Sequence, residues 1–351
     1  MNSKRIDRTG INRILVRSTN WVGDAVMTLP ALEAVKENFP GSIISVLAKP
    51  WVEPVFRSHP AVHEILIIRK GGGAFTGFGE LLRVIRSVRK RSFDLAILFQ
   101  NAFEAALISW AGGVRLRAGY NTDGRGVLLT HSVTRTQDVL DVHQVEYYLS
   151  LLQRLGLKTV KKDPVIHLST EERAVAEQRL RDFGMKDGTV VVGLNAGAIF
   201  GGAKRWAPER FATIGDRAVE EWGARVLVFG SAGERQIGKR VIRTMSQAAT
   251  DLCGQTSLRE AIALVSMCDI FVTNDSGLMH VASALNVPTV AVFGPTDQVA
   301  TGPRGQRIRV VNHRVHCSPC LKPECPTDHQ CMTGIGVEEV WKEMQDLRND
   351  F

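Results

Sequence analysis

Residues 269–296, DIFVTNDSGLMHVASALNVPTVAVFGPT, contain the pattern that decides the fold. Two short apolar runs, residues 270–273 and 289–293, predict buried strands, and residues 278–285 between them predict a helix. A strand, a helix and a second strand in this order predict a parallel βαβ unit. The polar turn NDSG joins the first strand to the helix, so we expect it at the sheet edge where ligands bind in open parallel sheets.

This turn offers backbone N–H groups to an anion. The first N–H groups of a helix have no partner within the helix, and the helix dipole adds positive potential there. Ser276 and Gly277 stand at the expected helix start, and a glycine lets a ligand approach the backbone closely. Capping of the helix by Asp275 or Ser276 would explain one polar residue, but not a carboxylate, a hydroxyl and a glycine together. We therefore predict a phosphate or pyrophosphate site at this turn.

The length and composition of the chain are typical of a two-domain globular protein. Its 351 residues exceed the roughly 250–300 that one hydrophobic core usually serves. Hydrophobic residues make up 44% of the chain and charged residues 23%, which is ordinary for a soluble protein. The N-terminal residues lack the apolar stretch of a signal peptide, and no apolar run is long enough to span a membrane. A cytoplasmic protein is expected.

Expected strands alternate with expected helices along both halves of the chain. The further strands are residues 13–18, 43–48, 65–68, 95–99, 190–195 and 225–229, and the further helices are residues 24–38, 170–183, 209–222, 233–245 and 258–266. This alternation predicts two α/β domains with parallel sheets. The polar segment 158–164 is the expected linker, so the domains are residues 1–165 and 166–351. The final helix is a candidate to pack back on the first domain.

The net charge of +8 is unevenly placed. The whole surplus lies in residues 1–180, whereas residues 181–351 carry equal numbers of acidic and basic side chains. Much of it falls in an expected amphipathic helix, residues 79–92, which follows a glycine-rich segment, residues 71–79, expected as a loop. A basic amphipathic helix suits a membrane surface or an acidic ligand, and an ordinary solvated helix face fits the same pattern.

Two further turns follow expected strands. Asp24 stands at the start of the first expected helix, where a carboxylate could remove a proton from a hydroxyl; helix capping is the alternative. Residues 197–206, GAIFGGAKRW, form a Gly-rich loop that ends in Lys204 and Arg205. Its amides and its lysine suit a phosphate, and a plain surface loop is the alternative. The first turn lacks the G-x-G-x-x-G pattern, which argues against a dinucleotide dehydrogenase.

Four cysteines lie close together near the C-terminus. Cys317, Cys320, Cys325 and Cys331 have the spacing C-x2-C-x4-C-x5-C. This set could hold a structural Zn²⁺, although the spacing differs from the usual two separated C-x2-C pairs. Reduced thiols in a reducing cytosol are the alternative. Both interpretations stay open at the level of the sequence.

Four motifs, in this order, resemble the bacterial ADP-heptose:lipopolysaccharide heptosyltransferases (glycosyltransferase family 9), and most of all the heptosyltransferase II type. They are NWVGDAVMTLPAL (residues 20–32), NAGAIFGGAKRWAPERFA (195–212), FGSAGE (229–234) and TNDSGLMHVASALNVPTVAVFGPT (273–296). QNAFEAAL (100–107) and AGYNTDGRGVLLT (118–130) also resemble acceptor-side segments of that type. The resemblance thus covers nearly the whole chain.

The resemblance implies a GT-B fold, in which two Rossmann-like domains face each other across a cleft. It also implies that Asp24 is the catalytic general base. The donor-binding residues that it implies are Lys204 for the diphosphate, Asp275 for the heptose hydroxyls, Ser276 and Gly277 for the diphosphate at the helix start, and Glu234 for the nucleoside.

The implied reaction is the inverting transfer of heptose from ADP-L-glycero-D-manno-heptose to the inner core of lipopolysaccharide, at the cytoplasmic face of the inner membrane. No cofactor is expected for catalysis, because Lys204 and the helix N–H groups can stabilise the ADP leaving group and the chain has no D-x-D cluster to bind Mg²⁺. A nucleotide-sugar epimerase of the same fold and a non-catalytic anion-binding protein are the alternatives. No nucleic-acid partner is expected, since no nucleic-acid-binding motif is present.

Overall fold

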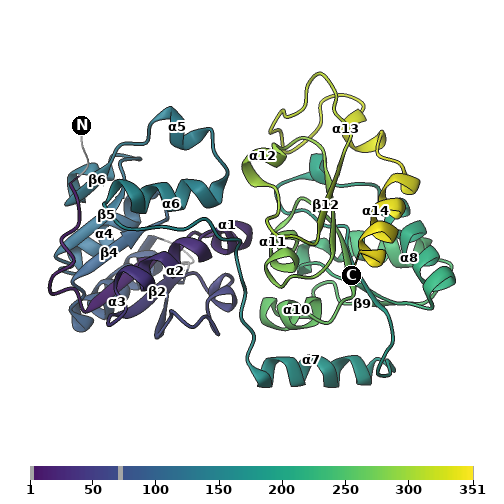
Figure 1. The fold of residues 1–351 in the computed structure, drawn as a ribbon, viewed down its shortest axis with the longest axis horizontal. Coiled ribbons are helices and arrows are strands. Elements are labelled where there is room, and N and C mark those ends of the chain that lie inside the picture. Colours follow the sequence, from purple (N-terminus) through teal and green to yellow (C-terminus); the bar gives the residue numbers. More distant parts are fainter. Residues whose placement is uncertain (1–3, 70–73, 351) are drawn as a thin grey trace. The chain divides into compact units, whose positions relative to one another are not determined.

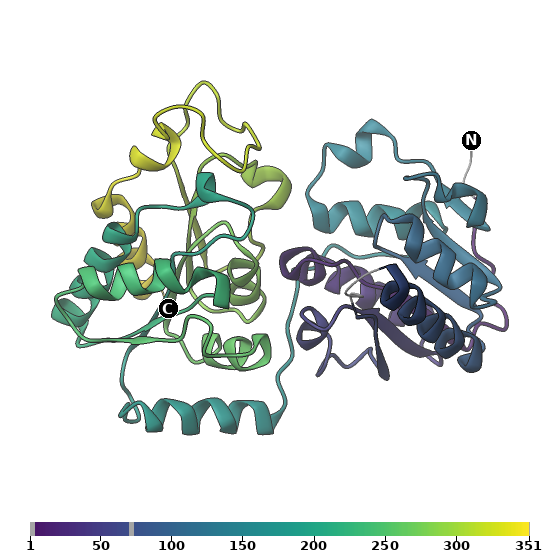
Figure 2. The ribbon, with the colours of Figure 1, turned by 180° about the vertical axis from the view of Figure 1, so that it is seen from behind.

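The computed structural model describes residues 4–69 and 74–350 and forms two compact units, residues 1–167 and 168–351 (Figure 1). The sequence placed this boundary between residues 165 and 166. Each unit contains a six-stranded sheet whose neighbouring strands all run parallel. Helices cover both faces of each sheet (Figures 1 and 2). The predicted α/β class with two Rossmann-like units is confirmed.

The sheet of the first unit has the strand order β3-β2-β1-β4-β5-β6. Its strands are β1 (Arg13–Arg17), β2 (Ile43–Ala48), β3 (Glu64–Ile67), β4 (Leu95–Leu98), β5 (Leu116–Tyr120) and β6 (His131–Val133). The order reverses between β1 and β4, which are hydrogen-bonded neighbours. Loops that leave the carboxyl ends of these two strands therefore diverge, and ligands of doubly wound sheets bind at such a switch point.

Two groups of helices flank this sheet. Helices α1 (Val22–Met27), α2 (Leu29–Asn38) and α6 (Gln144–Arg154) pack together, as do α3 (Ala74–Arg91) and α4 (Phe103–Ala111). The remaining helical elements of this unit are α5 (Gln137–Leu140) and the 3-10 turns η1 (Glu53–Val55) and η2 (Arg125–Leu128). Val84 and Val88 of α3 are buried against sheet residues such as Leu66 and Ala96, which accounts for the apolar stripe seen in the sequence.

Two expectations for the first unit were wrong in detail. The expected helix 24–38 is two helices, separated at Thr28. Pro30 explains the break, because a proline has no N–H for the helical hydrogen bond and fits only the first turn of a helix. Helix α3 begins at Ala74, so most of the expected loop 71–79 is helical, and residues 70–73 lie outside the described residues.

The sheet of the second unit repeats the same order, β12-β11-β10-β7-β8-β9. Its strands are β7 (Val191–Asn195), β8 (Arg225–Val228), β9 (Ala249–Asp251), β10 (Ile270–Asn274), β11 (Thr289–Phe293) and β12 (Ile308–Asn312). Here the switch point lies between β7 and β10, which are neighbours. The turn at residues 274–277 and the Gly-rich loop both leave the carboxyl ends of these two strands.

Helices cover both faces of the second sheet, because each connection between parallel strands crosses over one face. They are α7 (Thr170–Asp182), α8 (Pro208–Trp222), α9 (Arg235–Thr244), α10 (Leu258–Val265), α11 (Gly277–Ala284), α12 (Gln298–Thr301), α13 (Gln330–Thr333) and α14 (Val337–Asn349), with the 3-10 turns η3 (Gly202–Lys204) and η4 (Ala232–Glu234). Val290 and Val292 of β11 face the core that contains α8 and α14. Ala291 and Phe293, between and beyond them, pack with Met279 of α11 on the other face. Within the described residues, no helix is both long and apolar enough to cross a membrane.

The final helix, α14, packs within its own unit. Val340, Trp341, Met344 and Leu347 belong to the core of the second sheet, and Trp341 stacks on Trp222 with ring centroids 4.5 Å apart. Its apolar face therefore packs against β11, β12 and α8. The expectation that this helix also packs back on the first domain stays a prediction.

Candidate active site

Polar side chains join the two loops at the switch point of the second sheet. Asn195, the last residue of β7, donates to Thr273 Oγ1 at 3.0 Å and to Ser276 Oγ at 2.7 Å. Asn274, the last residue of β10, donates to the carbonyl of Ala196 at 2.8 Å. Two of these bonds are buried and the one to Ser276 is partly buried, and a hydrogen bond shielded from water holds its partners firmly. The Gly-rich loop and the NDSG turn are thus fixed to each other.

Lys204 and Asp275 meet in this corner. The Lys204 ammonium donates to Asp275 Oδ2 at 2.6 Å, and Thr296 Oγ1 donates to the same oxygen at 2.6 Å. The two charged side chains are only 14% and 6% exposed, so this is a largely desolvated ion pair rather than a surface contact. The Lys204 ammonium also lies 4.9 Å from the centroid of the Phe200 ring. The structure therefore brings together two residues that the sequence assigned to one ligand.

Ser276 is the N-cap of α11 and Gly277 is its first residue. The Ser276 hydroxyl accepts from the backbone N–H of Met279 at 3.4 Å, as a capping residue does. Because that hydroxyl caps the helix, what the turn offers a ligand is the backbone N–H groups at the helix start. Both ideas from the sequence, capping and an anion site, fit this geometry.

Glu234 has a structural role that the sequence did not assign. One of its carboxylate oxygens accepts from the backbone N–H and the hydroxyl of Ser231, both at 2.7 Å, which makes a capping box at the start of the 3-10 turn η4. The other oxygen lies against Gly197: a Cβ added there would be 2.2 Å from it. Glu234 is thus next to the Gly-rich loop, and its contact to a nucleoside remains a prediction.

Asp24 lies past the carboxyl end of β1, at the switch point of the first sheet. It is the third residue of α1 and not its N-cap, which is Trp21. A carboxylate in the first helical turn is favoured by the helix dipole. Tyr148 lies close by: burial raises the pKa of this phenol well above its usual value, and the negative charge of Asp24 adds to the shift. The sequence thus placed Asp24 at the edge where a ligand would bind.

Two buried arginines donate hydrogen bonds to the loops at the same edge, and sequence reasoning missed both. Arg17 donates to Asn20 Oδ1 at 2.9 Å, and Arg125 donates to Asn101 Oδ1 at 2.8 Å and to the Tyr120 carbonyl. Burial lowers the pKa of each guanidinium to about 10, so both stay charged at neutral pH. Arg17 could have been noticed, because it is a charged residue inside an expected buried strand.

The cysteine segment (residues 313–331) holds four thiols that are neighbours without forming a compact ligand set. Burial raises the pKa of Cys331, and Cys325, Cys317 and Cys320 add to the shift. Among residues 4–69 and 74–350, however, the one group of three or more metal-ligand side chains whose ligand atoms lie within 4.8 Å of one another is elsewhere. The predicted zinc site would therefore need the sulfur atoms to move together.

That group consists of Glu33, His59 and His167 in the first unit. Nε2 of His59 is 4.0 Å from a carboxylate oxygen of Glu33, and Lys162 binds the same carboxylate at 3.5 Å. Burial lowers the pKa of His59 to about 4, and His167 adds to the shift. Because the three residues are far apart in the sequence, no local spacing could have indicated the group.

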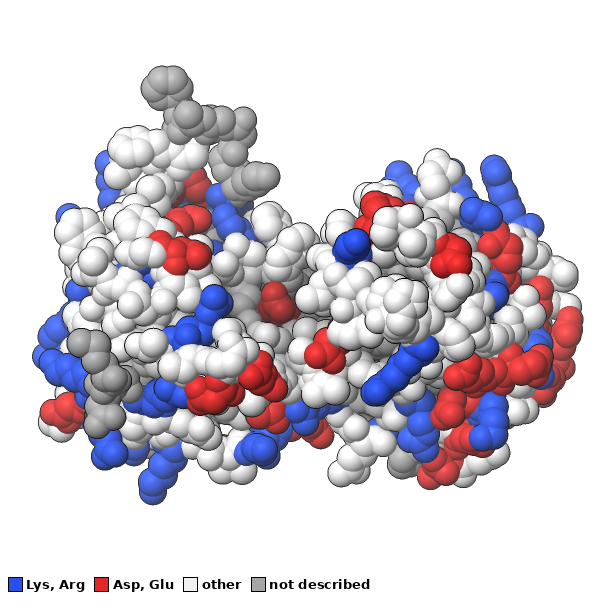
Figure 3. Space-filling view, turned by 90° about the horizontal axis from the view of Figure 1, so that it is seen from above, with Lys and Arg blue, Asp and Glu red and all other residues white. Residues whose placement is uncertain are grey.

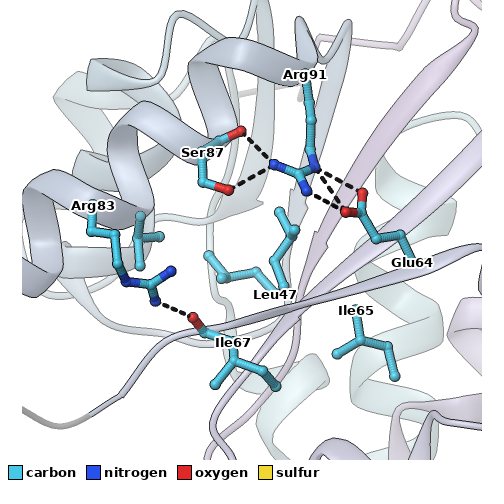
Figure 4. Close-up of a pocket in the computed structure, with 9 residues that line it drawn as sticks. Leu47, Glu64, Ile65, Ile67, Arg83, Ser87 and Arg91 are labelled. Carbon is cyan, nitrogen blue, oxygen red and sulfur yellow. Dashed lines mark hydrogen bonds and ion pairs between the residues drawn. The ribbon is translucent and has the colours of Figure 1, made fainter.

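A cavity of about 230 Å³ lies between α3 and strands β2 and β3 of the first sheet (Figure 4). Its charged side chains are already paired: Arg91 binds Glu64 and Ser87, and Arg83 donates to the Ile67 carbonyl. The cavity is on the β3 side of the sheet, away from the β1–β4 switch point. We therefore assign it no chemistry.

The described geometry defines a class of protein: two Rossmann-like units with a lysine–aspartate pair and a helix start at the switch point of the second and a carboxylate at that of the first. Residues 81–330 match the family model of glycosyltransferase family 9 (heptosyltransferase). The chain is 30% identical to lipopolysaccharide heptosyltransferase 2 of Salmonella typhimurium, over 96% of this chain and 99% of that protein. The corresponding Escherichia coli protein is 30% identical, over 95% and 98%.

Solved structures agree. The structure of E. coli ADP-heptose LPS heptosyltransferase II has a TM-score of 0.83 and 28% identity, over 96% of this chain and 99% of that one. A family 9 glycosyltransferase from Veillonella parvula has a TM-score of 0.87 at 23% identity, over 100% of both chains. The protein therefore belongs to glycosyltransferase family 9, the heptosyltransferases, and has the GT-B fold. Family membership favours glycosyl transfer over the epimerase and the non-catalytic alternatives.

Proposed function

We propose that the protein transfers heptose from ADP-L-glycero-D-manno-heptose to an inner-core sugar of lipopolysaccharide. The support comes from relatives that carry the name lipopolysaccharide heptosyltransferase 2 and match nearly the whole chain. It also comes from the fold shared with an ADP-heptose LPS heptosyltransferase II. These relatives, rather than the site alone, suggest which sugar and which acceptor are used.

The observation that carries the proposal is the corner formed by Lys204, Asp275 and the start of α11. An ammonium and helix N–H groups without a partner inside the helix together suit a diphosphate, and they stabilise the negative charge that grows on ADP as it leaves. Asp275 can accept hydrogen bonds from sugar hydroxyls, and in the structure Lys204 and Thr296 hold it in place. When the donor binds, Lys204 would then contact the diphosphate and Asp275 would contact the sugar.

Asp24 is proposed as the general base. Its carboxylate takes the proton of the acceptor hydroxyl while the hydroxyl oxygen forms a bond to the anomeric carbon of heptose. The bond from that carbon to the ADP oxygen breaks in the same step, so ADP leaves with the electron pair and the anomeric configuration inverts. Proton transfer by a positioned carboxylate typically contributes roughly 10²–10⁴-fold to a rate. No metal or other cofactor is assigned to this step, because Lys204 and the helix N–H groups supply the positive charge.

The acceptor is proposed to meet the basic first unit at the cytoplasmic face of the inner membrane, to which the protein would bind peripherally. On the face shown in Figure 3, Lys and Arg gather along one edge of the first unit, while acidic and basic side chains mingle on the second. The basic face of α3 is smaller than the sequence suggested. Arg83 is paired with Glu80 and Arg91 with Glu64. The other three cations of α3 are exposed: Arg89 also donates to the Ala111 carbonyl, and we propose Arg86 and Lys90 as the ones that meet anionic lipid.

Incubation with ADP-heptose and truncated lipopolysaccharide acceptors, followed by mass analysis of products, tests the proposal. We expect an acceptor enlarged by one heptose and one equivalent of ADP released. An epimerised free nucleotide sugar would point to the epimerase alternative, and the absence of any product with every acceptor would contradict the transferase proposal. Varying the core truncation identifies the acceptor sugar.

A further inference from the structure

The cysteine segment has no part in the proposed chemistry, yet it lies directly against the Gly-rich loop. The backbone N–H of Ala203 donates to the Pro323 carbonyl at 2.9 Å, and Nε2 of His329 pairs with the Ala203 carbonyl at 2.6 Å. The N–H of Gly202 donates to a carboxylate oxygen of Glu324 at 3.2 Å. Three backbone groups of the two residues that precede Lys204 are therefore held by one distant segment.

Close approach of the two segments explains a glycine in the loop. A Cβ added at Gly201 would be 2.1 Å from the carbonyl oxygen of Pro323, a distance that real Cβ atoms do not reach. Any larger residue at this position would push the loop off the segment. The glycine thus serves the contact between two parts of the protein as well as any approach of a ligand.

The other end of the cysteine segment holds the opposite side of the same corner. The N–H of Leu321 donates to the Pro295 carbonyl at 2.8 Å, and Ser318 donates to the Gly294 carbonyl. The next residue, Thr296, is the one that binds Asp275. A cavity of about 210 Å³ lies between this stretch and the start of the segment. The segment therefore contacts both the loop that carries Lys204 and the stretch that carries Thr296, and these two residues bind Asp275.

Outside the 3-10 turn η3, the Gly-rich loop has no regular structure of its own. Its conformation, and with it the place of the Lys204 ammonium, depends on contacts with its surroundings. A cation that is already in position loses less freedom when a ligand binds than one on a loose loop, so the same contacts give tighter binding.

We propose that the cysteine segment positions the Gly-rich loop for the donor, with Glu324 and His329 acting as positioning residues through Gly202 and Ala203. This inference rests on the proposed function, because it takes the nucleoside diphosphate as the ligand of Lys204. Loss of one of these two contacts lowers the affinity for ADP and raises the KM for the donor. The KM for the acceptor and the thermal midpoint stay near those of the unchanged protein.

The variants are His329→Asn and Glu324→Ala. His329 has φ +59°, a left-handed conformation that asparagine tolerates better than alanine, so the first variant shortens the side chain without adding backbone strain. Glu324→Gln keeps an oxygen that can accept from Gly202 and should restore affinity. His316→Ala, an exposed histidine of the same segment, is the matched control.

Calorimetry with ADP and steady-state kinetics with ADP-heptose give the readouts. Each contact-breaking variant should weaken ADP binding roughly 3–10-fold, the effect of one ordinary hydrogen bond. ADP affinities within twofold of the unchanged protein for both variants would overturn the inference, as would an equal loss in His316→Ala. If the unchanged protein itself does not bind ADP, the result contradicts the proposed function, and the positioning role, which rests on it, falls with it.

Discussion

The carboxyl edges of the two sheets have the same strand order but different polar groups. In the second unit, the switch point holds a lysine–aspartate pair and the start of a helix of eight residues. In the first unit, it holds Asp24 in the first turn of a six-residue helix, with two buried arginines nearby. The same strand order thus creates a switch point in each of the two sheets. The residues that follow the strands decide which chemistry each switch point suits: in our proposal, anion binding in the second unit and proton transfer in the first.

Replacement of Asp24 by asparagine should have the largest effect. Asparagine keeps the shape but cannot accept the acceptor's proton, so turnover should fall roughly 10²–10⁴-fold while ADP affinity stays unchanged. Single-turnover kinetics and calorimetry measure the two quantities. Asp163→Asn, at an exposed aspartate of the same unit, is the control. Turnover within threefold of the unchanged protein would leave Asp24 as part of the helix start only.

Lys204→Met tests the second edge. Removal of a charged hydrogen-bond donor from the diphosphate site should weaken ADP binding roughly 10–150-fold. It also leaves Asp275 buried without its cation, so the thermal midpoint should fall as well. Lys239→Met, on the exposed face of α9, should change neither quantity. An unchanged ADP affinity would remove the Gly-rich loop from the donor site.

The loss of folding stability in acid should arise in the first unit, from the protonation of His59. Burial holds its pKa at about 4, against about 6.5 in the unfolded chain, so the unfolded state binds more protons between these values. Stability should therefore fall as the pH drops through this window, by about 2–3 kcal/mol between pH 7.5 and 4.5. His59→Gln should lose most of this dependence in urea unfolding, whereas His316→Gln should keep it. Equal pH slopes in both variants would contradict the assignment.

The proposed contact with the membrane depends on α3. Arg86→Gln with Lys90→Gln should weaken binding to anionic vesicles roughly 30-fold, since each cation contributes about 1 kcal/mol. The difference should shrink as salt rises, because exposed charges are screened. Lys239→Gln with Arg243→Gln, on α9 of the second unit, is the matched control. Equal co-sedimentation of both pairs at low salt would make α3 an ordinary solvated face.

The cysteine segment gives the smallest and most specific test. A zinc site would show about one equivalent of metal in protein purified without chelator under reducing conditions, and chelation would then expose thiols and weaken ADP binding. Reduced thiols without metal would react in the order of their exposure, with Cys317 before the buried Cys331, and a chelator would change nothing. Metal analysis together with thiol titration decides between these two interpretations.

Much of the architecture could be predicted from local patterns. Apolar runs of strand length between amphipathic helices indicated parallel sheets, and β2 and β11 have the bounds expected from the sequence. Shorter or less apolar strands were not identified: β6 has three residues and β9 is only half-buried along its length. Such strands form because a neighbour offers them hydrogen bonds, which is information that their own residues do not contain.

The candidate site, like the fold, could be predicted from the sequence only in part. The sequence by itself determined the family, the βαβ frame and the residues that stand after its strands, because strand period, helix start and glycine position are local properties. Only the tertiary structure decided that Lys204 binds Asp275 across 71 positions, that Arg17 and Arg125 are buried beside Asp24's edge, and that the cysteine segment holds the Gly-rich loop. These contacts join residues far apart in the chain, so they exist only once the parallel strands bring the loop ends to a common edge.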